Sequence, residues 1–406
     1  MFTPAIRPSF SERILAPYRR ITSSGQFIPE IDGLRFVAIF LVYIYHVSGD
    51  ILRHSTAAAR LSYDGHWLFS VTHILNIGVP LFFVISGFIL GMPFAAAHLA
   101  GRPPVSLKKY FLRRVTRLEP PYILALLLFF VLKVAAARGT AHELLPNLLA
   151  SVFYVHNLVY GSPSVIDFVA WSLEIEVQFY ILAPLLALVF AVADAGLRRS
   201  LLALSILAAT ALSVATPQAL SLSLLSYAQY FLAGFLLVDL YLAGGLRRQG
   251  SWLWDLVSTA GWPLLLALLV TGGAAAGWVA PWLLALLFLA AFRGQAVNRI
   301  VTNAWIATIG GMCYSIYLLH NYIVAAIGPL TERMFSGYPF PARLLVQLVL
   351  MSPVVLGISA LYFRWVERPC MRPDWPRRMK AWFGHLRLRG YLTPAAVSAA
   401  RASSDE

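Results

Sequence analysis

Residues 33–52 read GLRFVAIFLVYIYHVSGDIL, and residues 74–92 read ILNIGVPLFFVISGFILGM. Each is an apolar run of about 20 residues, which crosses the hydrocarbon core of a bilayer as a helix at ~1.5 Å rise per residue. A shorter apolar stretch at 146–160 is expected to be re-entrant or interfacial. The sequence therefore predicts an all-α, polytopic integral membrane helix bundle of about ten transmembrane helices. The other eight runs lie at 118–137, 170–193, 200–216, 222–243, 254–271, 278–292, 305–328 and 341–365.

The composition agrees with this interpretation. Of the 406 residues, 59% are hydrophobic and 12% are charged, and the mean hydropathy is +0.71. A soluble domain is nearer half apolar and a quarter charged. A disordered chain, a nucleic-acid-binding domain and a cytosolic globular enzyme are therefore excluded. The two cysteines, Cys313 and Cys370, are too few for a disulfide framework.

The basic residues predict the orientation of the bundle. With the N-terminus in the cytoplasm, 24 of the 32 lysines and arginines lie on the cytoplasmic side, and Arg35 and Arg364 lie within helix ends. This asymmetry is what the positive-inside rule requires of a chain with both termini in the cytoplasm. We expect a tail at 1–30, a membrane domain at 31–366 and a basic tail at 367–406. The six basic residues placed outside are Arg53, Arg60, Lys133, Arg138, Arg333 and Arg343.

The first predicted helix carries four polar residues that are costly inside a membrane. Arg35 and His46 are eleven residues apart, which is three helical turns and ~16 Å along the axis. Tyr43 and Asp50 lie one turn on either side of His46, on the same face. A lone histidine is more often a packing residue, and an arginine at a helix end can be a snorkelling anchor. Four such residues on one stripe favour a functional site.

Two later helices add polar residues at a similar depth. The stretch 171–180, WSLEIEVQFY, carries Glu174 and Glu176, which point about 160–200° apart on a helix. We expect one of them to face the bundle and the other to lie at the interface. The stretch 314–321, YSIYLLHN, places Tyr317 and His320 on one polar stripe.

A basic cluster lies at the cytoplasmic start of the third helix. Residues 108–122 read KKYFLRRVTRLEPPY, in which Arg114 and Arg117 share a helix face ahead of an expected break at Pro120–Pro121. Guanidinium groups bind phosphate oxygens bidentately. Positive-inside anchoring alone would explain the sign of this cluster, but not Glu119 and the two prolines. The histidines show no metal-binding spacing, so no metal site is predicted.

These residues together suit transfer of an acyl group. A histidine in the outer half can act as general base for an acceptor hydroxyl that attacks an activated acyl carbon. The arginines at the inner face can hold the phosphates of a long donor, and coenzyme A has the required length.

The same residues carry a resemblance to a known family. The motifs are IDGLR at 31–35 with ten residues between Arg35 and His46, VPLFFVISGFIL at 79–90, RVTR at 114–117, WSLEIEVQFY at 171–180, YSIYLLH at 314–320 and VERP at 366–369. In this order they resemble the membrane acyltransferases of the acyltransferase-3 family, which acylate bacterial envelope glycans and related acceptors.

The resemblance implies roles for individual residues. His46 would be the catalytic histidine, Arg35 its essential companion, and Arg114 and Arg117 the residues that handle acyl-CoA. Glu176 matches the carboxylate of the family's WSLxxE pattern and would be catalytic. The remaining candidates for the substrate pocket are Tyr43, Asp50, Trp171, Tyr317 and His320.

Two departures from the family pattern matter. Many relatives read WSLSVEEQFY, whereas Glu174 here replaces the serine and Val177 the second glutamate, so the role of Glu174 stays open. The chain also lacks the Gly-Asp-Ser signature of the C-terminal hydrolase-like domain that some relatives carry. We therefore expect a stand-alone enzyme that delivers the acyl group itself.

The sequence thus predicts a multi-pass O-acyltransferase of the bacterial inner membrane. It would move an acetyl or other short acyl group from cytoplasmic acyl-CoA to a hydroxyl of an envelope or exported glycan. Its partners would be the bilayer, the acceptor and polysaccharide assembly machinery, with no nucleic acid and no metal. Whether His46 is a base or a transient acyl carrier is left open, as are the acceptor and the acyl length.

Two other functions are compatible with buried charges. A transporter or flippase of a lipid-linked or sugar-like solute would use them equally well, but the chain shows no repeat symmetry. A non-catalytic scaffold in a polysaccharide assembly complex would leave the buried Arg, His and Glu residues without a purpose.

Overall fold

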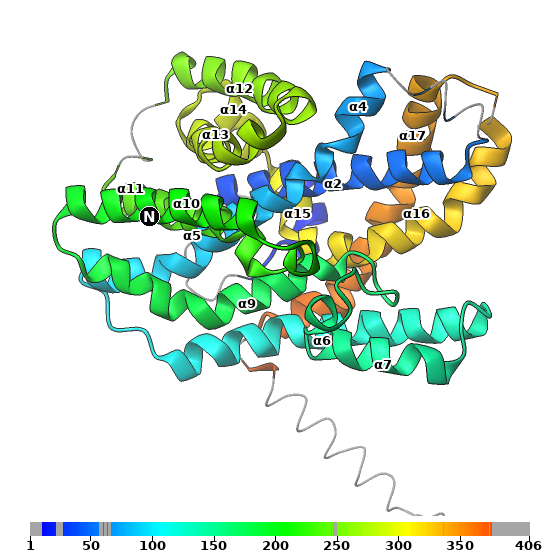
Figure 1. Cartoon of the computed structure of the whole chain (residues 1–406), viewed down its shortest axis with the longest axis horizontal. Coiled ribbons are helices and arrows are strands. Elements are labelled where there is room, and N and C mark those ends of the chain that lie inside the picture. The colour runs from blue at the N-terminus through cyan, green and yellow to red at the C-terminus, as the bar shows by residue number, and fades with distance from the viewer. Residues whose placement is uncertain are drawn as a thin grey trace, which may run out of the picture.

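The structure is a computed structural model that describes residues 10–21, 27–56, 60, 63, 66–244, 246, 250–335, 337–372 and 374–375. Most of these residues are helical, and no strand occurs among them. The all-α prediction is therefore confirmed (Figure 1). The predicted tail at 1–30 lies partly outside the described residues, and that at 367–406 lies largely outside them.

The helices follow one another along the chain with short connections. The long helices are α2 (Pro29–His54), α5 (Gly78–Leu99), α6 (Leu107–Ala135), α9 (Ala170–Leu186), α10 (Ala195–Ala215), α11 (Ala228–Leu242), α12 (Trp252–Thr271), α13 (Gly273–Arg293), α16 (Cys313–Phe335) and α17 (Phe340–Tyr362). The short helices are α1 (Phe10–Leu15), α4 (Trp67–His73), α7 (Ala141–Val152), α8 (His156–Tyr160), α14 (Ala296–Val301), α15 (Ala304–Gly311) and α18 (Arg368–Cys370). The 3-10 turns are η1 (Ala16–Tyr18), η2 (Leu75–Ile77), η3 (Ala187–Ala191), η4 (Gln218–Leu220) and η5 (Leu224–Ser226), and η6 (Phe363–Glu367) is a π-helical turn.

The described residues contain nine helical segments long and apolar enough to cross a membrane. They match nine of the ten predicted runs. The tenth, predicted at 222–243, is the shorter helix α11, which begins only after the turns η4 and η5. The stretch 146–160 falls on α7 and α8, which are separated at Phe153–Val155 and are each too short to cross a bilayer.

Helices α2, α6 and α16 run in the same direction, and all three end at the right of Figure 1. We call the side where they begin the proximal side and the side where they end the distal side. Because α2 is an unbroken helix from Pro29 to His54, Arg35 lies toward the proximal side and His46 toward the distal side. The predicted separation of ~16 Å along the axis therefore holds.

The centre of the bundle is the contact between α5 and α11. A Cβ atom on Gly87 would overlap the backbone carbonyl of Phe231, and one on Gly234 would overlap that of Val84. The two backbones thus approach more closely than any residue with a side chain allows, as small residues permit in membrane helices. Around this contact, Phe83 stacks on Phe231 with ring centroids 4.6 Å apart.

We expect Gly234→Ala to destabilise the protein by about 1–3 kcal/mol, because the added methyl group must push α5 and α11 apart. Thermal unfolding in detergent would measure the loss. Gly277→Ala is the matched control, since a Cβ atom at that position of α13 meets nothing within 4 Å. Equal melting temperatures for the two variants would contradict the close contact.

Helix α6 is unbroken through Pro120 and Pro121, so the predicted break is wrong. Pro120 cannot donate to the carbonyl of Thr116, and the indole Nε1 of Trp375 donates to that oxygen instead at 3.0 Å. The hydroxyl of Tyr362 donates to the carbonyl of Pro121 at 2.5 Å. Contacts from Tyr362 and Trp375 thus satisfy backbone groups around the two prolines, and they attach α6 to α17 and to the residues that follow η6.

Candidate active site

Five charged side chains from four segments line one cavity of about 110 Å³. The four segments are α2, α6, α9 and η6, and α5 and the start of α16 supply further lining residues, so the cavity brings together residues that are far apart in the chain. The cavity lies between the proximal side and the centre of the bundle. The charged residues are Arg35, Arg114, Arg117, Glu176 and Glu367, and the polar residues beside them are Ser86, Ser172, Tyr180, Cys313, Tyr314 and Tyr317.

Arg35 is held in place by an acid one turn earlier on α2. Its Nη1 atom lies 2.6 Å from Oδ1 of Asp32, which is 1% exposed. Arg20 approaches the same oxygen at 3.4 Å. The buried Asp32 carboxylate orients Arg35 and balances part of its charge, so the guanidinium is a fixed donor at the cavity wall.

Arg114 and Arg117 both line the cavity, as their three-residue spacing predicted. The guanidinium of Arg114 lies over the rings of Tyr110 and Tyr180, 5.9 and 5.5 Å from their centroids. The Nε atom of Arg117 is buried without a hydrogen-bond partner. No described residue accepts from this N–H, so it is free to donate to an oxyanion in the cavity. The other basic residues of this cluster, Lys108, Lys109 and Arg113, are exposed.

Glu176 and Glu174 point to opposite sides of α9, as expected. Glu176 lines the cavity and accepts a hydrogen bond from the hydroxyl of Ser86 at 2.5 Å. The expectation that one of the pair lies at the interface is wrong, because Glu174 is 0% exposed. Its Oε2 atom accepts the backbone N–H of Asn157 at 2.8 Å. Glu174 therefore anchors the beginning of α8, and α8 is the burial partner that the sequence pattern did not reveal.

This division predicts different effects for the two glutamates. Glu174→Ala leaves the Asn157 N–H unpaired and should cost about 1–3 kcal/mol of stability. Glu176→Gln keeps an acceptor for Ser86 and removes only the charge, so it should lower turnover at an unchanged melting temperature. Thermal unfolding and acyl transfer measured on the same preparations check both. Full turnover in Glu176→Gln would contradict a role for the Glu176 charge in acyl transfer.

His46 lies outside this cavity and meets a second histidine from α16. The ring centroids of His46 and His320 are 5.0 Å apart. The Nδ1 atom of His320 lies 3.0 Å from the carbonyl oxygen of Ile316 and 2.8 Å from that of Tyr317. Carbonyls only accept, so the proton is assigned to Nδ1 and the lone pair to Nε2. That Nε2 atom is buried and has no partner among the residues that the structure describes, which leaves a free acceptor beside His46.

Tyr317 connects the cavity with the histidine pair. It lines the cavity, and its ring centroid lies 5.9 Å from that of His320. The hydroxyl groups of Tyr317 and Ser172 are 2.7 Å apart, and Phe82 packs edge-on against the tyrosine ring at 5.9 Å. The arrangement therefore has three arginines on one side of Tyr317 and two histidines on the other.

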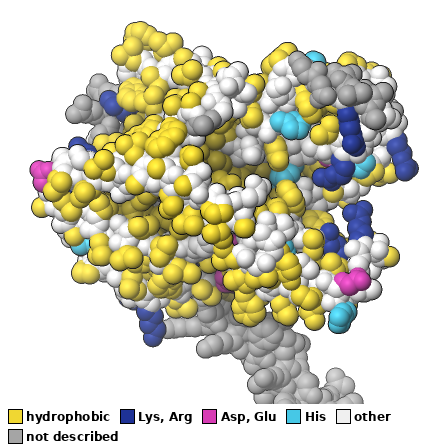
Figure 2. All heavy atoms as spheres, viewed as in Figure 1, with side chains coloured by type: hydrophobic (Ala, Val, Ile, Leu, Met, Phe, Trp, Pro, Cys, Tyr) yellow, Lys and Arg dark blue, Asp and Glu magenta, His cyan; other side chains and the backbone are white. Residues whose placement is uncertain are grey.

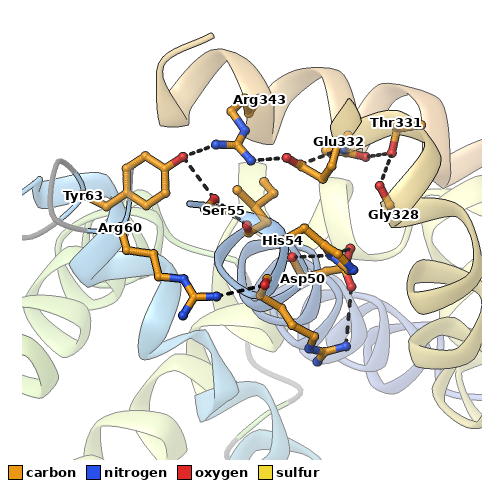
Figure 3. Close-up of polar contacts among 12 residues, drawn as sticks. Asp50, His54, Ser55, Arg60, Tyr63, Gly328, Thr331, Glu332 and Arg343 are labelled. Carbon is orange, nitrogen blue, oxygen red and sulfur yellow. Dashed lines mark hydrogen bonds and ion pairs between the residues drawn. The ribbon is translucent and has the colours of Figure 1, made fainter. Parts of the chain in front are cut away.

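Four predicted pocket residues do not line the cavity, and His320, which meets His46, is one of them. Tyr43 faces α17, where the hydroxyl of Ser352 lies 3.3 Å from its own. Trp171 packs on the ring of Tyr227 at 5.6 Å. Asp50 belongs to a buried network at the distal side, where it lies 3.3 Å from His54 Nδ1 (Figure 3).

The distal network ties α2 to α16 and α17. Arg343, which is 2% exposed, pairs with Glu332 and donates to the hydroxyl of Tyr63. Gln347 donates to the other oxygen of Glu332 at 2.7 Å. Figure 3 shows this group beside Asp50 at the end of α2. Its buried charges are paired within the network, so it serves packing of the distal side.

Sequence reasoning missed two acids of the site, Asp32 and Glu367. Each lies inside a motif already quoted, IDGLR and VERP, and each is an acid at or within an apolar run, which is the signal that could have found it. Glu367 accepts hydrogen bonds from the backbone N–H and the hydroxyl of Ser315, at 3.1 and 2.5 Å. The π-helical turn at 363–367 is a feature often found at functional sites.

The chain matches a known protein family over most of its length. The family model described as "Acyltransferase domain" matches residues 28–364. The chain belongs to this acyltransferase family. The match covers every residue of the cavity and the histidine pair except Glu367. With nine candidate membrane helices in the part of the chain that the structure describes, the chain is a multi-pass membrane member of the family.

Named relatives match part of the chain. Peptidoglycan O-acetyltransferase OatA of Listeria monocytogenes is 30% identical over 178 residues, which are 41% of this chain and 25% of the relative. YrhL of Bacillus subtilis, provisionally named a peptidoglycan O-acetyltransferase, is 29% identical over 41% of this chain and 25% of its own length. The chain thus spans about a quarter of the length of these relatives. No solved structure matches the chain.

Proposed function

We propose that this acyltransferase is an O-acyltransferase that moves an acetyl or other short acyl group from acyl-CoA to a hydroxyl of a bacterial envelope or exported glycan. The observation that carries the proposal is the spatial order of side chains across the bundle. Three arginines line a cavity with Glu176 and Glu367, Tyr317 lies at its edge, and the paired histidines lie beyond it.

The donor would bind from the proximal side, which we propose is cytoplasmic. Arg35, Arg114 and Arg117 would hold its phosphate oxygens. A cavity of about 110 Å³ is small beside the several hundred Å³ of a typical ligand pocket, so it would hold only part of coenzyme A. The acyl end would then lie near Tyr317, within reach of the histidines.

Transfer requires one deprotonation and one bond exchange. The acceptor hydroxyl would give its proton to His46 while its oxygen bonds to the thioester carbonyl carbon. Collapse of the adduct would break the C–S bond, and the thiolate would take up a proton to leave as free coenzyme A. The Nε2 lone pair of His320 would hold the His46 ring by accepting a hydrogen bond from it when that ring becomes an imidazolium.

The names of the relatives support the choice of an envelope glycan as acceptor and of acetyl as the acyl group. OatA is named for peptidoglycan O-acetylation in a bacterium. The proposed location is accordingly the cytoplasmic membrane, where acyl-CoA is available on one side and exported glycan on the other.

A measurement of turnover in detergent micelles distinguishes the proposed enzyme from a transporter. Purified protein is mixed with acetyl-CoA and a hydroxyl-bearing oligosaccharide, and free thiol and acetylated sugar are measured. An enzyme turns over without a sealed compartment, whereas a transporter moves solute only between compartments. Acceptor-dependent thiol release with matching sugar acetylation is the expected result. Their absence in micelles, with solute uptake in vesicles, would favour the transporter.

The native Cys313 in the cavity wall reports donor binding directly. We expect acetyl-CoA, which has no free thiol of its own to consume the reagent, to slow alkylation of Cys313 by N-ethylmaleimide at least fivefold, because the donor covers the cysteine. S-acetylpantetheine, which lacks the nucleotide phosphates, should protect only at much higher concentration. The Cys370→Ala variant leaves Cys313 as the sole thiol. Unchanged alkylation would place the donor elsewhere.

A further inference from the structure

The distal side carries basic residues that the mechanism does not use. Figure 2 shows Lys and Arg side chains gathered at the right of the molecule, where α2, α6 and α16 end. Positive charge on this side runs against the positive-inside trend, so orientation in the membrane does not account for it. We call these five residues the basic rim: Arg53, Arg60, Lys133, Arg138 and Arg333.

Most of the rim is without an acidic partner in the part of the chain that the structure describes. Arg53 lies 3.6 Å from the buried Asp50 and is itself 62% exposed. The other four have no described carboxylate within ion-pair distance. The exposed Glu143 accepts the backbone N–H of Thr140 in a capping box, so its carboxylate is already engaged.

Lys133 lies close to the loop that precedes α9. Its Nζ atom lies over the ring of Tyr322, 5.6 Å from the centroid, and the hydroxyl of Tyr322 donates to the carbonyl of Ile166. The next residue is the buried Asp167, whose pKa burial raises to about 8. Burial thus favours the neutral form of Asp167 beside Lys133.

The rim flanks the route to His46. Phe168 follows Asp167, its ring centroid lies 6.0 Å from that of His46, and it is 46% exposed. The imidazole thus lies one side chain below the surface at this point. Lys133, in the last turn of α6, lies within electrostatic range of Arg138 and Asp167, and Arg53, in the last turn of α2, lies within range of an electrostatic effect on His46.

We propose that the acceptor is an anionic glycan whose carboxylate or phosphate groups bind the basic rim while the hydroxyl to be acylated reaches His46 past Phe168. This inference rests on the proposed function and narrows its substrate class. Charges spread along a rim suit a repeating polyanion, since each repeat presents a new anionic group while one hydroxyl enters the site. Anionic lipid headgroups are the competing occupant of the basic rim, but their binding does not require a route to the buried His46.

Binding measured without donor tests the inference. The probes are a fluorescent oligogalacturonate, its neutral methyl ester, and a phosphate-bearing oligosaccharide of the same length. The protein is held in nanodiscs of phosphatidylcholine. We expect oligogalacturonate or the phosphate probe to bind at least tenfold more tightly than the ester, with an advantage that falls as salt rises. Whichever probe binds more tightly identifies the anionic group.

The Lys133→Gln, Arg138→Gln double variant should lose about tenfold in affinity for the anionic probe and nothing for the ester. Arg299→Gln, an exposed arginine on the proximal side, is the control and should bind as the wild type does. Equal affinity for charged and neutral probes, or an unchanged double variant, would overturn the inference. A double variant that loses only binding to phosphatidylglycerol nanodiscs would assign the rim to lipid and overturn it as well.

The two failures can be told apart. Anionic binding without acetyl transfer to any probe would refute the proposed function and leave an anion site standing. Transfer to the ester and the anion with equal KM would support the proposed function and refute this inference.

Discussion

The His46→Ala variant is expected to lose acyl transfer by about 10²–10⁴-fold, the range that a positioned general base contributes, while remaining folded in the membrane. His46 is the ionisable group that lies between the exposed Phe168 and the cavity-side Tyr317–His320 pair. The measurement is acetyl-CoA-dependent acylation of the oligosaccharide, together with the mass of envelope glycans from cells carrying each variant at matched protein levels.

His142→Ala is the control for this prediction. His142 is exposed at the start of α7, on the distal side, so its loss should change nothing. His320→Ala should retain more activity than His46→Ala, because His320 acts through the orientation of the neighbouring ring. Full activity in His46→Ala, or glycans identical in mass, would refute the mechanism.

The base and carrier roles of His46 also give different results. A carrier would release one equivalent of coenzyme A per enzyme in a burst before acceptor is added, whereas a base would release none. The burst would be visible as rapid thiol release, and the acyl group on His46 as a mass increase of the protein.

The second large effect is expected from the Arg114→Gln, Arg117→Gln double variant, which should raise KM for acyl-CoA about 100-fold with a smaller change in kcat. Charged hydrogen bonds contribute about 1.5–3 kcal/mol each, so two lost contacts account for a factor of this size. Steady-state kinetics at varied acyl-CoA and saturating acceptor would measure it. The ratio of kcat to KM separates donor binding from chemistry.

Lys108→Gln with Lys109→Gln is the matched control, since it removes the same charge one to two turns earlier on α6 from exposed positions. If the cluster only anchors the helix at the membrane surface, both double variants should have the same unchanged KM. A raised KM in the Arg variant alone would separate the cavity arginines from the surface lysines.

Features that depend on one helix could be predicted from the sequence. The spacing of Arg114 and Arg117 places them on one face of α6, and both do line the cavity. The two-residue spacing of Glu174 and Glu176 places them on opposite faces of α9, and they do face opposite sides. Helical periodicity repeats every 3.6 residues whatever surrounds the helix, so these relations are local.

Features that depend on which helices are neighbours could not be predicted in the same way. The α2 stripe places Tyr43 and Asp50 near His46, yet both face α16 or α17 and not the cavity. Glu174 was expected at the membrane interface because the sequence near it does not indicate that α8 is its partner. The prolines of α6 were expected to break the helix, since Pro cannot donate a backbone hydrogen bond. The groups that instead satisfy the carbonyls of Thr116 and Pro121 come from Trp375 and Tyr362, which are far away in the sequence.

The sequence by itself determined that this protein is a multi-pass helix bundle of an acyltransferase family, because apolar runs, charge asymmetry and motif spacing are properties of short segments. Only the tertiary structure decided that His46 meets His320, that Glu367 completes the arginine cavity, and that Tyr317 lies between the two groups. These contacts join residues far apart in the chain. Their geometry follows from close packing of whole helices, as at the Gly87 and Gly234 contact, and no local pattern encodes which faces meet.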